Sequence, residues 1–100
     1  MAIQAGDPVH PLSHHGIALY APAKSGTYAI CDGNGVYIYF GESKDVQRRL
    51  SEHLNDPYDL IHVYGAVSFT YELYETELER VLRQNALILA FPTPCNQRLG

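Results

Sequence analysis

The stretch GTYAICDGNGVYIYFG, residues 26–41, decides the fold of this chain of 100 residues. It holds two runs rich in Tyr, Ile and Val, at 27–31 and 36–40, and the turn-forming residues DGNG at 32–35 separate them. Turn residues between two such runs predict a β-hairpin.

The hairpin is expected to bring two tyrosines together. If DGNG alone forms the loop, Cys31 faces Val36 and, counting outward, Tyr28 faces Tyr39. Because side chains alternate across a strand, one face then carries Tyr28, Ile30, Tyr37 and Tyr39. The other face, which we expect to be the core face, carries Ala29, Val36, Ile38 and Phe40.

A helix is predicted from Ser43 to Leu54, because apolar residues recur there at helical spacing and Ser43 is available as the N-cap. Arg49 and His53 stand four residues apart on it. They therefore lie one above the other, beside the apolar stripe.

A strand and a second helix complete the pattern. Apolar and polar residues alternate over 67–74, which predicts a strand with one face toward solvent. The helix is predicted from its N-cap Thr76 to Ala90, with an inward stripe of Leu78, Val81, Leu82 and Leu89 and with Asn85 on the same line. The order β-β-α-β-α indicates a small α+β domain.

Residues 1–25 are interpreted as a partly flexible N-terminal extension of a folded domain at 26–100. The extension contains three prolines and no lasting periodicity, and one short extended piece is expected at 17–20. Its histidines have no acidic or thiol partner at ligand spacing, so we interpret them as part of a polar arm: His10, His14 and His15.

Composition restricts the class of protein. With 46% hydrophobic and 18% charged residues, the chain is expected to form a globular core. The longest apolar run, at 86–91, is too short to span a bilayer, so we expect a cytoplasmic protein without membrane contact. The net charge of −4 argues against binding nucleic acid through the overall field of the molecule.

Three motifs, in fixed order, resemble the GIY-YIG nuclease family: Gly26-Thr27-Tyr28, Tyr39-Phe40-Gly41, and Arg49 followed by His53. The segment 79–96 is similar to the end of the same domain in the bacterial excision-repair nuclease, and homing and restriction endonucleases have related domains. The resemblance covers about 26–96, nearly the whole chain apart from the extension.

The resemblance implies a three-stranded antiparallel sheet flanked by helices, and metal-dependent hydrolysis of DNA phosphodiester bonds. It implies that Tyr28 and Tyr39 line the site and that one of them helps to activate water. Arg49 and His53 would contact the scissile phosphate, and Asn96 would support the site and the bound nucleic acid. The implied cofactor is a single divalent ion, Mg²⁺ or Mn²⁺. The implied partner is double-stranded or branched DNA, together with a second copy of the chain or an additional DNA-recognition chain.

The positive charge is local. The helix expected to face DNA concentrates Lys44, Arg48, Arg49 and His53. Arginine suits a phosphate because its planar fork matches the phosphate oxygens and stays charged. The acidic balance therefore predicts weak, salt-sensitive binding and does not exclude DNA.

Gln84 departs from the family pattern. Counting back from Asn96 without a gap places the family's metal-binding glutamate at Gln84, whose neutral amide lacks the charge that Mg²⁺ prefers. Three explanations stay open: a deliberate Glu→Gln change, a natural domain that has lost its metal chemistry, or a shifted register in which Glu77 or Glu79 is the ligand. The alternative function is a non-catalytic DNA-binding or assembly module on the same fold.

Overall fold

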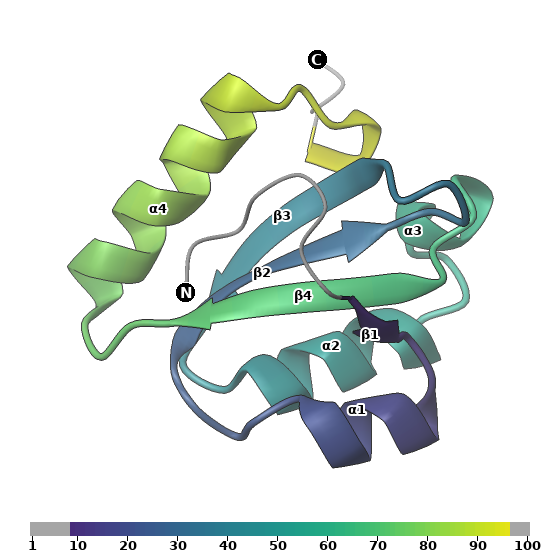
Figure 1. The fold of residues 1–100 in the computed structure, drawn as a ribbon, viewed down its shortest axis with the longest axis horizontal. Coiled ribbons are helices and arrows are strands. Elements are labelled where there is room, and N and C mark those ends of the chain that lie inside the picture. Colours follow the sequence, from purple (N-terminus) through teal and green to yellow (C-terminus); the bar gives the residue numbers. More distant parts are fainter. Residues whose placement is uncertain (1–8, 97–100) are drawn as a thin grey trace.

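The computed structural model describes residues 9–96, which form a four-stranded antiparallel sheet in the order β1-β4-β2-β3 with helices on both faces (Figure 1). Residues 1–8 of the expected extension and 97–100 of the expected domain lie outside the described residues. The elements are β1 (His10–Pro11), α1 (His14–Tyr20), β2 (Gly26–Cys31), β3 (Tyr37–Ser43), α2 (Val46–Asn55), α3 (Leu60–Val63), β4 (Ser68–Leu73), α4 (Glu77–Ala90) and the 3-10 helix η1 (Pro94–Asn96). The α+β class is confirmed, but the sheet has four strands where three were expected, because β1 pairs with β4.

The hairpin of β2 and β3 is confirmed, but the predicted register is wrong. Tyr28 faces Gly41, and Tyr39 faces Ile30. The loop is shorter than expected because the backbone N–H of Asp32 already donates to the carbonyl of Val36. A β-bulge next to Ile30 then shifts the pairing further, so the two tyrosines are diagonal neighbours.

Both faces of the sheet are buried, where one core face was expected. Ala29 and Phe40 pack under α4 with Leu87. The opposite face carries the larger cluster, which α1, α2 and α3 cover: Leu12, Ile17, Ala21, Tyr28, Ile30, Ile38, Val46, Leu50, Ile61 and Phe69. The bulge moves Ile38 to this second face.

The helix α2 begins later than predicted. Its N-cap is Asp45, whose carboxylate accepts from the backbone N–H of Arg48 at 2.9 Å. Ser43 instead ends β3, and its hydroxyl accepts from the N–H of Asp45 at 3.0 Å. Ser43 therefore supports the cap residue without being the cap.

The helix α4 has the predicted N-cap, Thr76, but presents a different face to the sheet. The predicted inward leucines Leu78, Leu82 and Leu89 are 68%, 58% and 85% exposed. Two arginines replace them, because the sheet offers carboxylates there. Arg80 Nε donates to Glu42 at 2.6 Å, and Arg83 Nε donates to Glu72 at 2.8 Å.

Residues 9–25 add a strand and a helix to the fold. β1 pairs with β4, and Ser13 caps α1 by accepting from the N–H of Gly16 at 3.0 Å. The piece expected to be extended at 17–20 is helical, and its Ile17 is buried in the core. Within the described part of the chain, no helix is long and apolar enough to cross a membrane.

Candidate active site

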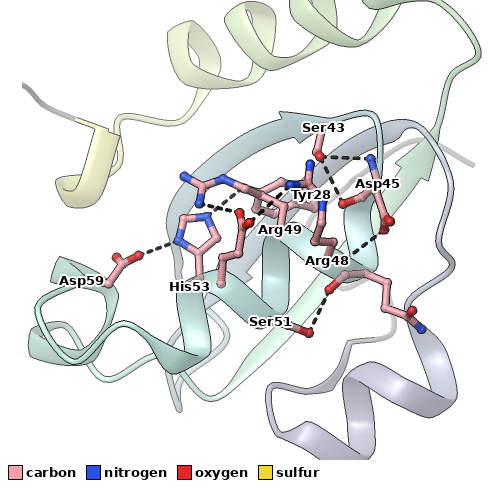
Figure 2. Close-up of polar contacts among 10 residues, drawn as sticks. Tyr28, Ser43, Asp45, Arg48, Arg49, Ser51, His53 and Asp59 are labelled. Carbon is pink, nitrogen blue, oxygen red and sulfur yellow. Dashed lines mark hydrogen bonds and ion pairs between the residues drawn. The ribbon is translucent and has the colours of Figure 1, made fainter.

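Three side chains linked by hydrogen bonds form the centre of the site (Figure 2). The hydroxyl of Tyr28 lies 2.7 Å from Nε2 of His53, and Nδ1 of His53 lies 2.6 Å from Oδ2 of Asp59. Tyr28 comes from β2 and His53 from α2, and both are buried. The structure therefore brings together two of the predicted site residues, and Asp59 joins them.

The protons shared by these three side chains have one consistent arrangement at neutral pH. Burial raises the pKa of Tyr28 well above its ordinary value, and the nearby Tyr39 raises it further, so Tyr28 keeps its proton. Burial lowers the pKa of His53, although its hydrogen bond with Asp59 opposes this, so the imidazole is neutral. Tyr28 then donates to Nε2, and the Nδ1–H of His53 donates to Asp59.

Gly41 allows the Tyr28 hydroxyl to lie against the backbone of β3. A Cβ at residue 41 would overlap this hydroxyl and would stand 2.8 Å from Cε2 of Tyr39. Because Tyr28 is fully buried, it has no room to move aside. The motif glycine thus sets the position of both tyrosines.

Arg49 lies one helical turn before His53. Its guanidinium is 3.3 Å from Glu52, which also binds Arg48 at 3.3 Å. Burial lowers the pKa of Arg49, but Tyr28, Tyr39 and Glu52 together raise it above its ordinary value. Arg49 therefore carries a permanent positive charge beside the two tyrosines.

The remaining predicted DNA contacts are more peripheral. Arg48 is exposed on α2, and Lys44 is exposed in the turn that precedes this helix. Both lie on the same segment as Arg49, as the sequence predicts. Whether they bind DNA stays a prediction.

A cavity of about 420 Å³ adjoins this cluster and is lined by Tyr39, Gln84, Asn85, Ile88, Cys95 and Asn96. Tyr39 links the two regions, since its ring lies 4.9 Å from that of His53 and 6.0 Å from that of Tyr28. Gln84 lines this cavity, and its assignment to the metal-ligand position stays a prediction. A second cavity, of about 510 Å³ at Lys24 and Glu75, contains none of the predicted site residues.

The two glutamates weighed as alternative ligands are placed elsewhere. Glu79 completes a capping box, because its carboxylate accepts from the N–H and the hydroxyl of Thr76 at 3.3 and 2.8 Å. Glu77 lines a different cavity, with Leu78 and Val81. Neither of them lines the cavity at Gln84.

Asn96 clamps the strand that carries Tyr39. Its Oδ1 accepts from the N–H of Phe40 at 2.7 Å, and its Nδ2 donates to the carbonyl of Phe40 at 2.8 Å. The hydroxyl of Thr93 also donates to Oδ1. Because the backbone uses this amide, the geometry supports a positioning role for Asn96 next to the cavity.

The cavity does not fit a hard divalent cation well. Its lining side chains offer neutral amide, hydroxyl and thiol groups and no carboxylate. Among residues 9–96, no group of three or more His, Cys, Asp and Glu side chains could hold a metal ion. Mg²⁺ prefers charged oxygen ligands, so Gln84 is a poor substitute for a glutamate.

Asp59 was not identified from the sequence. It is the N-cap of α3, where its Oδ1 accepts from the N–H of Ile61 at 3.1 Å. An Asp directly before the apolar pair Leu60 and Ile61 is a helix-start signal, six residues after His53. The signal was present, but four helical residues are too few to show periodicity.

Acid is expected to destabilise the fold through His53. Burial lowers its pKa below the ordinary value of 6.5. As the pH falls through 6.5, the unfolded chain binds this proton before the folded chain does, so the free energy of unfolding decreases. Urea unfolding about one pH unit above and below this value should show a smaller decrease in a His53→Gln variant than in the parent. Equal decreases would contradict the expectation.

Known proteins are similar to this chain in sequence and in fold. The family model of the GIY-YIG catalytic domain matches residues 24–80. UvrABC system protein C of Treponema denticola is 39% identical over 77 residues, which cover 74% of this chain and 12% of that protein. The Treponema pallidum protein of the same name is 35% identical over 74 residues, covering 71% of this chain and 11% of that protein. The chain thus spans a small fraction of these relatives.

Solved structures of GIY-YIG domains are similar to this chain in fold. The magnesium-bound GIY-YIG N-terminal endonuclease domain of UvrC from Thermotoga maritima has a TM-score of 0.71 at 24% identity, covering 84% of this chain and 96% of that chain. A point mutant of that domain, bound to its catalytic divalent cation, has a TM-score of 0.71 at 25% identity, covering 85% and 96%. These structures show that the fold is shared.

Proposed function

This chain belongs to the GIY-YIG catalytic domain family, and from that premise we propose that it is a DNA endonuclease domain whose metal site lacks its carboxylate. One observation carries the proposal: Tyr28, Tyr39, Arg49 and His53 lie together beside the cavity that Gln84 lines. In this proposal these four side chains bind the phosphate and move the proton. The altered part is the residue at the metal-ligand position, which is Gln84 where the family has a glutamate.

Each of these side chains has a role in the proposal. Arg49 exchanges Glu52 for a phosphodiester oxygen and stabilises the charge that develops there. Tyr39, which lines the cavity, orients the attacking water and takes its proton, while Tyr28 passes its own proton to His53. Lys44 and Arg48 contact flanking phosphates and supply affinity without sequence preference.

The metal-binding part of the proposal concerns residue 84. In the Thermotoga maritima domain the bound cation is magnesium. A carboxylate at residue 84 would supply the charged oxygen that such a cation requires, and the amide of Gln84 does not. We therefore expect this chain to bind DNA and to cleave it poorly.

The deciding experiment incubates the chain and its Gln84→Glu variant with supercoiled, linear and branched DNA in Mg²⁺ or Mn²⁺. Cutting by the variant and not by the parent supports an endonuclease whose lesion is Gln84. Binding without cutting by either protein would overturn the endonuclease proposal. It would instead favour a non-catalytic DNA-binding module, the function that the neutral cavity supports second best.

Arg49→Ala is expected to weaken DNA binding and to lower the slope of log affinity against log salt by about 1, because one phosphate contact is lost. Fluorescence anisotropy over a salt series measures both quantities. Lys24→Ala is the matched control, since it removes the same charge at the separate cavity beside Leu73 and Tyr74. If the slope of log affinity against log salt changes equally in both variants, Arg49 makes no specific contact with the DNA phosphates.

The net charge of −4 predicts weak binding by a single copy. A second copy would add a second set of the basic side chains on α2, and an additional DNA-recognition chain could bring positive charge of its own. This partner is part of the proposal, and sedimentation with and without DNA tests it.

A further inference from the structure

We propose that Asp59 is a positioning residue that holds His53 in the one tautomer able to accept the proton of Tyr28. The effect of Asp59 on catalysis rests on the proposed endonuclease function. Its effect on the His53 tautomer does not depend on that function.

The two carboxylate oxygens of Asp59 have different partners. Oδ1 accepts from the backbone N–H of Ile61 at 3.1 Å and so caps α3, while Oδ2 lies 2.6 Å from Nδ1 of His53. The carboxylate therefore cannot rotate without losing the cap. A second contact joins the same elements, because Nε2 of His62 donates to the carbonyl of His53 at 3.2 Å.

Asp59 controls which ring nitrogen is free. An ionised carboxylate only accepts, so it requires a proton on Nδ1. In a neutral imidazole Nε2 is then the acceptor, and it faces the Tyr28 hydroxyl at 2.7 Å. The charges and hydroxyls around the ring are those of Tyr28, Tyr39, Arg49, Glu52 and Asp59.

The hydrogen-bonded side chains Tyr28 and His53 can move one proton away from the cavity. The O–H bond of Tyr28 breaks as an Nε2–H bond forms on His53. Tyr28 recovers a proton from Tyr39, the side chain with which it also interacts by a hydrogen bond, and Tyr39 recovers one from the water, which becomes hydroxide. The net transfer is one proton from water to His53, and Asp59 stabilises the imidazolium that results.

Asp59→Asn tests the tautomer directly. The side-chain oxygen of the new amide would keep the cap at Ile61, so its NH₂ group would face Nδ1 of His53. Two donors cannot pair, so the imidazole is expected to move its proton to Nε2. The ring ¹⁵N chemical shifts of His53, measured by NMR, distinguish the two tautomers. An unchanged tautomer in Asp59→Asn would overturn the proposal.

Asp45→Asn is the matched control, because Asp45 caps α2 in the same way and is hydrogen-bonded to Arg48, not to a histidine. It should leave the His53 shifts unchanged, and the same change in this control would also overturn the proposal. If Asp59→Asn does not fold, Asp59→Ser keeps a capping hydroxyl and removes the carboxylate. A mixture of tautomers is then expected, and a pure Nδ1–H form would count against the proposal.

A rate measurement adds the catalytic consequence. In the Gln84→Glu background, Asp59→Asn should lower the cleavage rate about 10²-fold with unchanged DNA affinity, the size of effect that proton transfer commonly contributes. Asp45→Asn should leave the rate within about 2-fold. Failure of Gln84→Glu to cut would refute the proposed function alone, since the NMR result still decides the tautomer. Equal cutting with and without Asp59→Asn would refute the role of Asp59 alone.

Discussion

The Gln84→Glu variant is expected to cleave DNA in Mg²⁺ about 10³-fold faster than the parent chain. The change adds the charged oxygen that is missing from the cavity beside Tyr39. A bound cation contributes several kcal/mol to the stabilisation of a phosphoryl transition state, and about 4 kcal/mol corresponds to this factor. Conversion of supercoiled plasmid to nicked circles, followed over time at several Mg²⁺ concentrations, measures the rate.

Asn85→Asp is the matched control for that experiment. Asn85 lines the same cavity and is adjacent to Gln84, so the substitution adds the same charge at a different point. A much smaller gain is expected, because a metal ligand must also have the correct direction. An equal gain would show that the charge of the cavity, and not the position of residue 84, limits cleavage.

Gly41→Ala is expected to lower the free energy of unfolding by about 3 kcal/mol, at the upper end of the cost of overpacking a core. The added methyl group would overlap the hydroxyl of Tyr28, which is fully buried. Urea unfolding followed by circular dichroism measures the change. The hydrogen bond between Tyr28 and His53 should be disturbed too, so the His53 ring shifts should move.

Gly33→Ala provides the comparison for this prediction. A Cβ at Gly33, in the hairpin loop, would meet nothing within 4 Å, so its effect should stay within about 0.5 kcal/mol. If Gly41→Ala is as mild as Gly33→Ala, Tyr28 has more freedom than the packing indicates.

Local patterns made much of the fold predictable. Turn residues located the β2–β3 hairpin, and Thr76 marked the start of α4, because these signals act within a few residues. The direction in which α4 faces depends on partners far away in the sequence. Arg80 and Arg83 bind Glu42 and Glu72, and no periodicity in the helix reveals those ion pairs.

The candidate site was predictable to a similar degree. The resemblance supplied Tyr28, Tyr39, Arg49 and His53, and the structure places them together. It did not supply Asp59, because the contact of Asp59 with His53 depends on how the chain turns between α2 and α3. The register of the hairpin was not predictable either, because a shorter loop and then a bulge each shift the pairing of β2 with β3.

The strand order of the sheet bears on the order in which the parts of this site come together during folding. β2 pairs with β3 through a short loop, whereas β2 pairs with β4 only after the chain has passed through α2 and α3. Local pairings form early, and closing a long loop costs more entropy. We therefore expect the hairpin that carries the two tyrosines to form before the longer segment with α2 and α3 is closed by β4. We therefore expect a partly folded chain to display the hairpin before Asp59 contacts His53, so the proposed proton path would be completed late in folding.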